Sequence, residues 1–211
     1  MKQFTDRREY QFAQLNENQL TPDPIKQLDT WLNQAIELPI QDANAMVLST
    51  LNPELEISAR VVLLKQIDQT GLTFFTSLNS EKAQDIRFSN KVSVLFPWLA
   101  LDRQVRIKGI AEPIPTHFAK LYFQTRPRNS QLTAWVNSTS LIADSKQYLK
   151  HQYQYMKQKF LNQQIPMPDN WGGYIIKPHY FEFWQGGEAR LHDRLCYQLC
   201  AKTGWKISRL V

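Results

Sequence analysis

The sequence is poor in cysteine and histidine, the residue types that build disulfide frameworks and transition-metal sites. Its 211 residues include two cysteines and four histidines. Cys196 and Cys200 lie on one short segment at a spacing that favours neither a disulfide nor a complete ligand set, so we expect free thiols in a reducing compartment. His117, His151 and His179 show no ligand spacing. We therefore expect no metal site.

Glycine-rich loops and long apolar runs are also missing. The seven glycines of the chain form no phosphate-binding loop, which argues against a dinucleotide-binding or P-loop fold. No apolar run approaches the ~20 residues that span a bilayer. We therefore expect a cytoplasmic protein with no membrane partner.

The charge of the chain is basic but dispersed. The formal net charge is +6 and the sequence pI is about 9.3, which permits nucleic acid, membrane surface or a phosphorylated small molecule as partner. The basic residues do not cluster, and no zinc-finger or helix-turn-helix pattern occurs. A small-molecule phosphate site therefore competes well with a nucleic-acid surface, and we expect no nucleic-acid partner.

Hydrophobic periodicity predicts a mainly β protein with flanking helices (α+β). Short strands with tight polar connections favour antiparallel pairing in a barrel or sandwich. Asp23 begins a predicted helix over 24–37 with Trp31 in the core. Phe118, Leu121 and Tyr122 are at core spacing on a second predicted helix. Further predicted helices cover 81–88 after a Ser80 cap, 116–125 from a Thr116 cap, and 137–160; predicted strands cover 46–51, 57–67, 72–76, 92–98, 104–111, 171–183, 195–199 and 205–210.

Chemistry is densest in residues 183–194, which hold two glycines, two arginines, a histidine and two acids. The glycine pair at 186–187 lies between two β-forming segments and predicts the turn of a hairpin. On an ideal strand Arg190, His192 and Arg194 share one face, which suits an anionic or π-rich ligand. A solvated edge strand, whose charges block pairing with other chains, is the alternative interpretation.

Two other groups of residues suggest anion sites. Arg60 and Lys65 face opposite ways on an ideal strand, which indicates two separate anionic sites or a charge at each strand end. Tyr122 and Arg126 share a helix face, and Ser130 extends it if the helix bends at the intervening proline. Two hydroxyls and a guanidinium would form a phosphate grip; a solvated helix end is the alternative.

Several motifs resemble the pyridoxamine 5'-phosphate oxidase family, flavin enzymes that make pyridoxal phosphate. They are Trp-Gln-Gly-Gly-Glu-x-Arg-Leu-His-Asp-Arg at 184–194, Arg-Arg-Glu-Tyr at 7–10 and Tyr-Phe-x-x-Arg-Pro-Arg-x-Ser-Gln-x-x-Ala-Trp at 122–135. The resemblance implies an FMN-binding split β-barrel that works as a homodimer with FMN at the subunit interface. Residues 1–22 are polar and lack periodicity, which alone indicates a mobile tail, whereas the resemblance implies a segment that folds over the substrate. Residues 23–211 would form a single domain with a C-terminal dimerisation and active-site region.

The reaction implied by the resemblance is the oxidation of pyridoxamine 5'-phosphate and pyridoxine 5'-phosphate to pyridoxal 5'-phosphate in vitamin B6 salvage. Hydride passes to FMN and then to dioxygen, giving hydrogen peroxide, and the amine also releases ammonia. Arg190 and His192 would be catalytic and would bind substrate together with Arg7, Tyr10, Lys65, Tyr122, Arg126 and Ser130. The implied FMN contacts are Arg60, Val61, Val62, Leu63, Leu64, Lys65, Phe75, Thr76, Glu81, Lys82, Gln104, Thr139, Ser140, Trp184 and Arg194.

Two positions depart from the family pattern. Glu81 stands where an arginine is usual, and it either turns away as a first-turn acid or lowers flavin affinity. Thr139 replaces a glutamine, so the shorter side chain must reach the flavin or a water must bridge. These departures motivate an alternative, a non-catalytic pyridoxal phosphate/FMN-binding protein of the same fold. The hypothesis of a nucleic-acid-binding protein is supported by the pI alone. Another split-barrel flavin oxidoreductase, with a different substrate, is a further alternative, but it would have to explain the substrate-phosphate motif.

Overall fold

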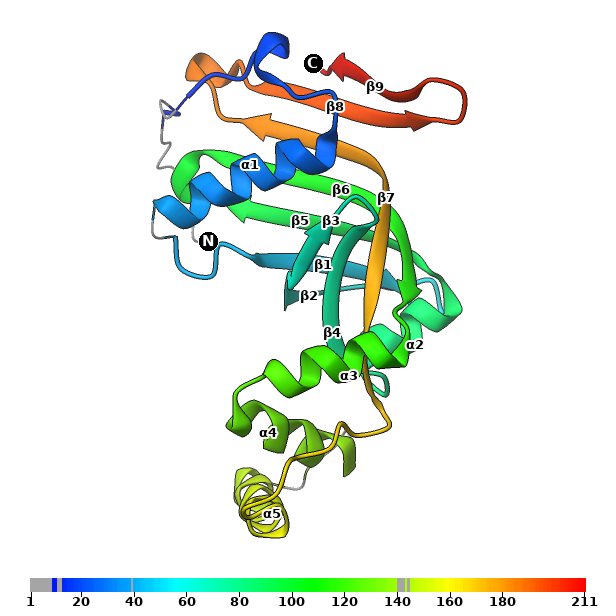
Figure 1. Cartoon of the computed structure of the whole chain (residues 1–211). Helices are drawn as coiled ribbons and strands as arrows, with labels where there is room; N and C mark the ends of the chain where they lie inside the picture. The colour runs from blue at the N-terminus through cyan, green and yellow to red at the C-terminus, as the bar shows by residue number, and fades with distance from the viewer. Residues whose placement is uncertain (1–8, 11–12, 39, 140–142, 144) are drawn as a thin grey trace, which may run out of the picture.

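The computed structural model describes residues 9–10, 13–38, 40–139, 143 and 145–211 (Figure 1). Within them, nine strands form one curled antiparallel sheet with the neighbour order β2-β1-β5-β6-β7-β4-β3, and β8 and β9 continue from β7. The strands are β1 (Ala45–Leu51), β2 (Ile57–Leu63), β3 (Gln66–Asp68), β4 (Gly71–Ser77), β5 (Lys91–Trp98), β6 (Arg103–Pro113), β7 (Trp171–Gln185), β8 (Asp193–Cys200) and β9 (Gly204–Arg209). The α-helices are α1 (Pro24–Glu37), α2 (Glu81–Phe88), α3 (Thr116–Thr125), α4 (Arg128–Thr139) and α5 (Lys146–Lys159), and 3₁₀ turns cover Glu17–Gln19, Leu99–Leu101 and Glu188–Arg190. The predicted mainly β class with flanking helices is confirmed.

Strand β7 connects the two ends of the sheet. Its first part pairs with β4, where Gly173 lies opposite Phe75, and its last part pairs with β8, where Trp184 lies opposite Arg194. Strand β6 pairs along its other edge. On one edge of β7, the partner strand thus changes from β4 to β8. Strand β4 runs toward helices α3 and α4, whereas β8 and β9 lie at the opposite end of the molecule (Figure 1).

Two apolar clusters fill the interior. The larger lies between the sheet and α1, where the Trp31 and Phe183 rings meet edge to face at 5.2 Å. The smaller joins α3, α4 and α5 around Phe123 and Trp171. Helix α1 begins as predicted, since the Asp23 carboxylate accepts a hydrogen bond from the first-turn backbone. Both cysteines are free, one buried and one half-buried.

The predicted strand 57–67 is two strands. The backbone N–H of Leu64 donates to Asn44 O at 2.9 Å, whereas that of Lys65 donates to Thr73 O at 2.9 Å. The chain therefore leaves β1 and joins β4 between these two residues. Local hydrophobic periodicity does not reveal a change of partner strand, because both partners are distant in sequence.

The helical region after α3 also differs from the prediction. Residues 137–139 end α4, and α5 begins only at Lys146, where the Ser145 hydroxyl accepts the Tyr148 N–H at 3.1 Å. The predicted helix over 137–160 is therefore not continuous, because residues 143 and 145 belong to no helix. Pro115 precedes the first residue of α3, so Thr116 lies inside the helix and is not its cap.

Helix α3 buries a different face from the one predicted. Ala119 and Phe123 are buried, whereas Phe118 and Leu121 are exposed to solvent. Tyr122 is partly buried and packs against the smaller cluster. The helix packs on the smaller cluster, which includes Trp171 at the start of β7, and not on the larger one. This tertiary packing overrides the apparent core spacing. None of the helices in the described ranges has the length and apolar composition that a membrane crossing requires.

The described part of the N-terminal segment packs along β8 and β9. The Leu15 N–H donates to the Asp193 carboxylate at 2.9 Å, and Arg209 donates to Leu15 O at 3.1 Å. The Tyr197 hydroxyl donates to Thr21 O at 2.7 Å. These contacts carry the chain toward the connection between β7 and β8.

Candidate active site

A cavity of about 580 Å³ lies between β2, β4 and the junction of α3 with α4. We call it the cation-lined cavity, after Lys65, Lys82 and Arg126. Ten of the predicted site residues line it: Val61, Val62, Leu63, Lys65, Phe75, Thr76, Lys82, Tyr122, Arg126 and Ser130. Thr125, Pro127 and Trp171, which the sequence analysis did not assign to the site, complete the lining.

The junction of α3 with α4 brings the proposed phosphate grip together. Arg126 ends α3 in an extended conformation, as expected for a residue before proline. The Ser130 N–H donates to Pro127 O at 2.8 Å, which starts α4 at once. Tyr122, Arg126 and Ser130 therefore reach the same cavity, as the bend at Pro127 predicts.

Arg126 has an unsatisfied donor inside this cavity. Its Nη1 is buried and has no hydrogen-bond partner among the described residues. The guanidinium lies over the Trp171 ring at 4.8 Å, and burial lowers the pKa of Arg126. Burial also raises the pKa of the neighbouring Tyr122. A buried N–H without a partner costs free energy, and an anion in the cavity would satisfy it.

An aromatic wall closes one side of the cavity. The ring of Phe75 stacks on that of Tyr122, with centroids 3.9 Å apart, and on that of Trp171, with centroids 5.3 Å apart. Flat stacked rings offer a surface suited to a planar heteroaromatic ligand.

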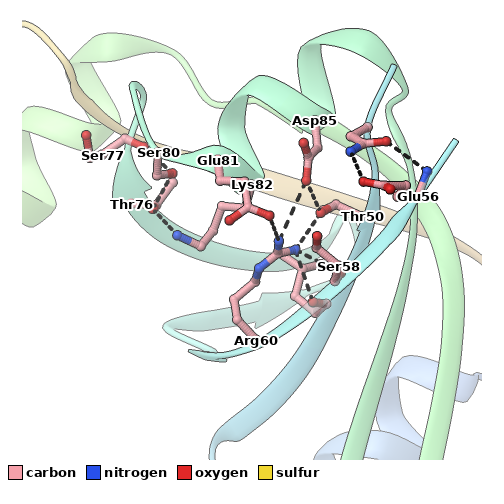
Figure 2. Close-up of polar contacts among 12 residues, drawn as sticks. Thr50, Glu56, Ser58, Arg60, Thr76, Ser77, Ser80, Glu81, Lys82 and Asp85 are labelled. Carbon is pink, nitrogen blue, oxygen red and sulfur yellow. Dashed lines mark hydrogen bonds and ion pairs between the residues drawn. The ribbon is translucent and has the colours of Figure 1, made fainter. Parts of the chain in front are cut away.

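Lys82 points from the start of α2 toward hydroxyl groups (Figure 2). Its Nζ lies 3.4 Å from the Thr76 hydroxyl, which lies 3.3 Å from that of Ser80. Burial, followed by repulsion from Arg60, lowers the pKa of Lys82. Ser80 stands at the predicted cap position, but its hydroxyl donates to Ser77 O at 2.7 Å instead of capping the helix. Hydroxyls and an ammonium beside a helix start form a suitable anion site.

Arg60 is held apart from the cavity by acids. Its Nη2 lies 3.3 Å from a Glu81 carboxylate oxygen and 3.6 Å from one of Asp85 (Figure 2). Its Nη1 donates to the Thr50 hydroxyl, which in turn donates to Asp85 at 2.6 Å. Arg60 and Lys65 therefore lie in different surroundings, and of the two only Lys65 lines the cavity. The sequence analysis did not identify Asp85 or Thr50.

A second group of site residues gathers at the connection between β7 and β8. We call it the loop cluster; its members are Tyr10, Trp184, Arg190, His192 and Arg194. The Tyr10 ring lies 5.6 Å from the Trp184 ring and 5.4 Å from the His192 ring, and the last two lie 4.7 Å apart. The N-terminal segment thus adds one aromatic side chain to this cluster.

Close contacts require both glycines of the connection. A Cβ on Gly186 would lie 2.6 Å from the Tyr10 ring, and one on Gly187 would lie 2.1 Å from the Leu191 carbonyl oxygen. The Gly187 N–H donates to Nδ1 of His192 at 3.2 Å. Since Nδ1 accepts this bond, Nε2 carries the proton of the neutral ring.

The predicted hairpin is confirmed, but its connection is longer than the glycine pair. Glu188–Arg190 form a 3₁₀ turn in which Ala189 and Arg190 have φ of 50° and 64°. The chain needs this left-handed reversal to return to β8, which begins at Asp193. The prediction that Arg190, His192 and Arg194 share a strand face is therefore wrong, because the first two precede the strand.

A buried carboxylate holds the arginine of β8. Glu182 in β7 accepts hydrogen bonds from Arg194 Nε at 3.1 Å, from the Tyr180 hydroxyl at 3.1 Å and from Arg106. Arg194 also donates to the Val211 carbonyl oxygen at 2.6 Å. The sequence analysis did not identify Glu182, although an acid between two phenylalanines on an apolar strand is a usable signal.

The two groups lie at opposite ends of β7. Trp171 at its start lines the cation-lined cavity, and Trp184 near its end belongs to the loop cluster. About 13 strand residues separate them, which corresponds to about 40 Å of extended chain. Gln104 lies at the same end of β7 as the loop cluster, because it is opposite Trp184 in the pairing of β6 with β7. One subunit therefore keeps the two groups apart.

Three predicted site residues fall wholly or partly outside the described part of the chain. Arg7 and Ser140 lie outside the described residues, as does the side chain of Thr139, the last residue of α4. Leu64 packs into the larger apolar cluster.

Family comparisons agree with the site motifs. The family model described as pyridoxamine 5'-phosphate oxidase matches residues 32–160, and the one described as the pyridoxine 5'-phosphate oxidase C-terminal dimerisation region matches residues 171–211. The pyridoxine/pyridoxamine 5'-phosphate oxidase of Teredinibacter turnerae is 48% identical over 205 residues, which cover 97% of this chain and 96% of that protein.

Solved structures show the same fold. PhzG from Burkholderia lata, in complex with tetrahydrophenazine-1-carboxylic acid, superposes with a TM-score of 0.85 and 26% identity over 92% of this chain and 94% of its own. A pyridoxamine 5'-phosphate oxidase-related, FMN-binding protein from Nostoc punctiforme gives a TM-score of 0.72 and 12% identity over 91% of this chain and 100% of its own. The predicted split-barrel fold is confirmed. Since both family models match and the identity extends over the full length of a relative, the chain belongs to the pyridoxine/pyridoxamine 5'-phosphate oxidase family.

Proposed function

We propose that the chain oxidises pyridoxamine 5'-phosphate and pyridoxine 5'-phosphate to pyridoxal 5'-phosphate, with FMN as cofactor and dioxygen as acceptor. The alcohol substrate gives up two electrons and two protons, which reduce dioxygen to hydrogen peroxide. The amine substrate additionally takes up water and releases ammonia. Family membership supports the oxidase class.

The observation that carries the substrate class is the buried, unpartnered donor of Arg126. Lys65, Tyr122 and Ser130 line the same cavity. A phosphate group supplies the acceptor oxygens that such a set of donors requires. Binding at this remote group would position the reacting carbon of the vitamer.

The residues predicted to hold FMN fit a flavin phosphate with one exception. Lys82 and Thr76 offer a cation and a hydroxyl beside the start of α2, and Phe75 lines the same cavity. The exception is Glu81, whose carboxylate contacts Arg60. When bound, FMN supplies the hydride acceptor of the reaction, while the protein supplies binding, orientation and charge.

A homodimer would unite the two separated groups. Strand β2 exposes an apolar face that includes Ile57, Val61 and Leu63, and residues 171–211 match a dimerisation region. Exposed apolar patches of this kind mark interfaces. Val61 and Leu63 also line the cation-lined cavity. We infer that the loop cluster of one protomer faces the cation-lined cavity of its partner.

Within such a site, the loop cluster would act on the ring of the vitamer. The proton on Nε2 of His192 can be donated to a ring oxygen, and Arg190 can hold the same ring by charge. Arg194, oriented by Glu182, would place a positive charge beside the cofactor, where negative charge develops.

An anaerobic titration tests this proposal. Pyridoxine 5'-phosphate is added to the FMN-loaded protein while the visible absorbance of the flavin is followed. We expect bleaching, recovery on admission of air, and formation of an aldehyde. If FMN binds but neither phosphorylated vitamer bleaches it, the substrate assignment is wrong. If FMN does not bind, the non-catalytic alternative replaces the oxidase.

A further inference from the structure

We propose that the Glu81 carboxylate competes with the phosphate of FMN for Arg60 and so weakens the binding of FMN. This inference rests on the proposed function, because it assumes that a flavin phosphate binds beside α2. With Glu81 present, the free energy of FMN binding is smaller, so the flavin-free protein is more populated at a given FMN concentration.

The two acids that contact Arg60 differ in how firmly they are held. The Asp85 side chain is 5% exposed, and its carboxylate accepts a 2.6 Å hydrogen bond from Thr50. The Glu81 side chain is 70% exposed and lies at the first position of α2 (Figure 2). Asp85 is therefore a fixed partner of Arg60, whereas Glu81 can rotate into solvent at little cost.

The charges of this cluster show what Glu81 prevents. Arg60 and Lys82 are cations, and Asp85 and Glu81 are carboxylates, so the four formal charges cancel. Lys82 contacts the Thr76 hydroxyl at 3.4 Å, which leaves its ammonium suited to an anion. A phosphate that binds between Lys82 and Arg60 must displace the Glu81 carboxylate or accept its repulsion. Without the charge of Glu81 the cluster would carry one net positive charge and attract a dianion.

The expected effect is moderate, because Glu81 is exposed. Replacing Glu81 by glutamine should tighten FMN binding by about 3- to 10-fold, the range expected when one exposed ion pair and one like-charge contact are removed. The gain should shrink as salt rises, since exposed charges are screened.

The test measures flavin affinity by quenching of flavin fluorescence, with no turnover required. Glu81→Gln is compared with wild type and with Glu56→Gln, using FMN and riboflavin as ligands. Glu56 is a matched control, because it is exposed on the same side of the molecule and its carboxylate accepts a hydrogen bond from Asn52 (Figure 2). Riboflavin lacks the phosphate and reports every other effect on the flavin site.

We expect Glu81→Gln to tighten FMN but not riboflavin, and Glu56→Gln to change neither. Unchanged or weaker FMN binding by Glu81→Gln overturns the inference, and so does an equal gain for riboflavin or for Glu56→Gln. If wild type and both variants bind neither flavin, the proposed function fails together with the inference. Binding of FMN by wild type with no gain in Glu81→Gln defeats the inference alone.

Discussion

The cation-lined cavity and the loop cluster hold their charged residues in opposite ways. In the cavity, Arg126 is half-buried, and its buried Nη1 has no hydrogen-bond partner in the described part of the chain. In the loop cluster, Arg194 is already engaged by Glu182 and by the chain end, and the rings of Tyr10 and Trp184 pack on each other. The difference indicates that the cavity is completed by its ligand, whereas the loop cluster is organised in advance by its own contacts.

Removing the buried acid should have the largest effect on this comparison. Glu182→Gln takes the shared charge from Arg106 and Arg194, and breaking a buried pair costs about 3 kcal/mol. We expect that loss in the free energy of unfolding, measured with urea. Glu112→Gln is the matched control, because it breaks a half-exposed pair with Lys177 and should cost about 0.5 kcal/mol. Equal losses would show that Glu182 does not organise the loop cluster.

Removing Arg126, whose Nη1 has no hydrogen-bond partner among the described residues, should affect activity more than folding. Arg126→Ala is expected to lower kcat/KM for both phosphorylated vitamers at least ~10-fold, a loss near 1.4 kcal/mol of transition-state binding. Stability should fall only slightly, since Nη1 makes no hydrogen bond and the loss is confined to the contact of the guanidinium with nearby rings such as that of Trp171. Lys120→Ala, an exposed cation on the same helix, serves as the control. Unchanged steady-state kinetics would reject the phosphate-anchoring role.

Mixed dimers would show whether the two groups meet across the subunit interface. Arg126→Ala and Arg190→Met damage different groups, so a dimer with one subunit of each kind keeps one intact site. Random mixing of two nearly inactive variants should therefore restore about one quarter of the wild-type activity. Mixtures that stay as inactive as the separate variants would place both groups of a site in one subunit.

The sequence predicted best those residues whose positions are fixed by regular secondary structure. Tyr122, Arg126 and Ser130 share one cavity because helix periodicity and a proline bend fix their directions. Helix α1 follows from its cap and its apolar spacing. These features depend on neighbours within a few residues, so local patterns contain the information.

Features that depend on distant partners were missed or misjudged. Arg190 does not lie on the predicted strand, because the connection between β7 and β8 includes two residues with left-handed backbone, Ala189 and Arg190 itself. Phe118 and Leu121 are exposed because α3 turns Ala119 and Phe123 toward the smaller cluster around Trp171. The acids that hold Arg60 and Arg194 come from other elements, and no local pattern specifies such a pairing.

The long strand β7 also sets the order in which the site can arise during synthesis. Its pairs with β4 join residues about 100 positions apart, and contacts of such range form late. The cation-lined cavity includes Trp171, so a growing chain carries most of the anchoring residues long before the cavity can close around them. Until β7 has been synthesised, the edges of β4 and β6 that pair with it have no partner strand, and unpaired edges of this kind are prone to aggregation.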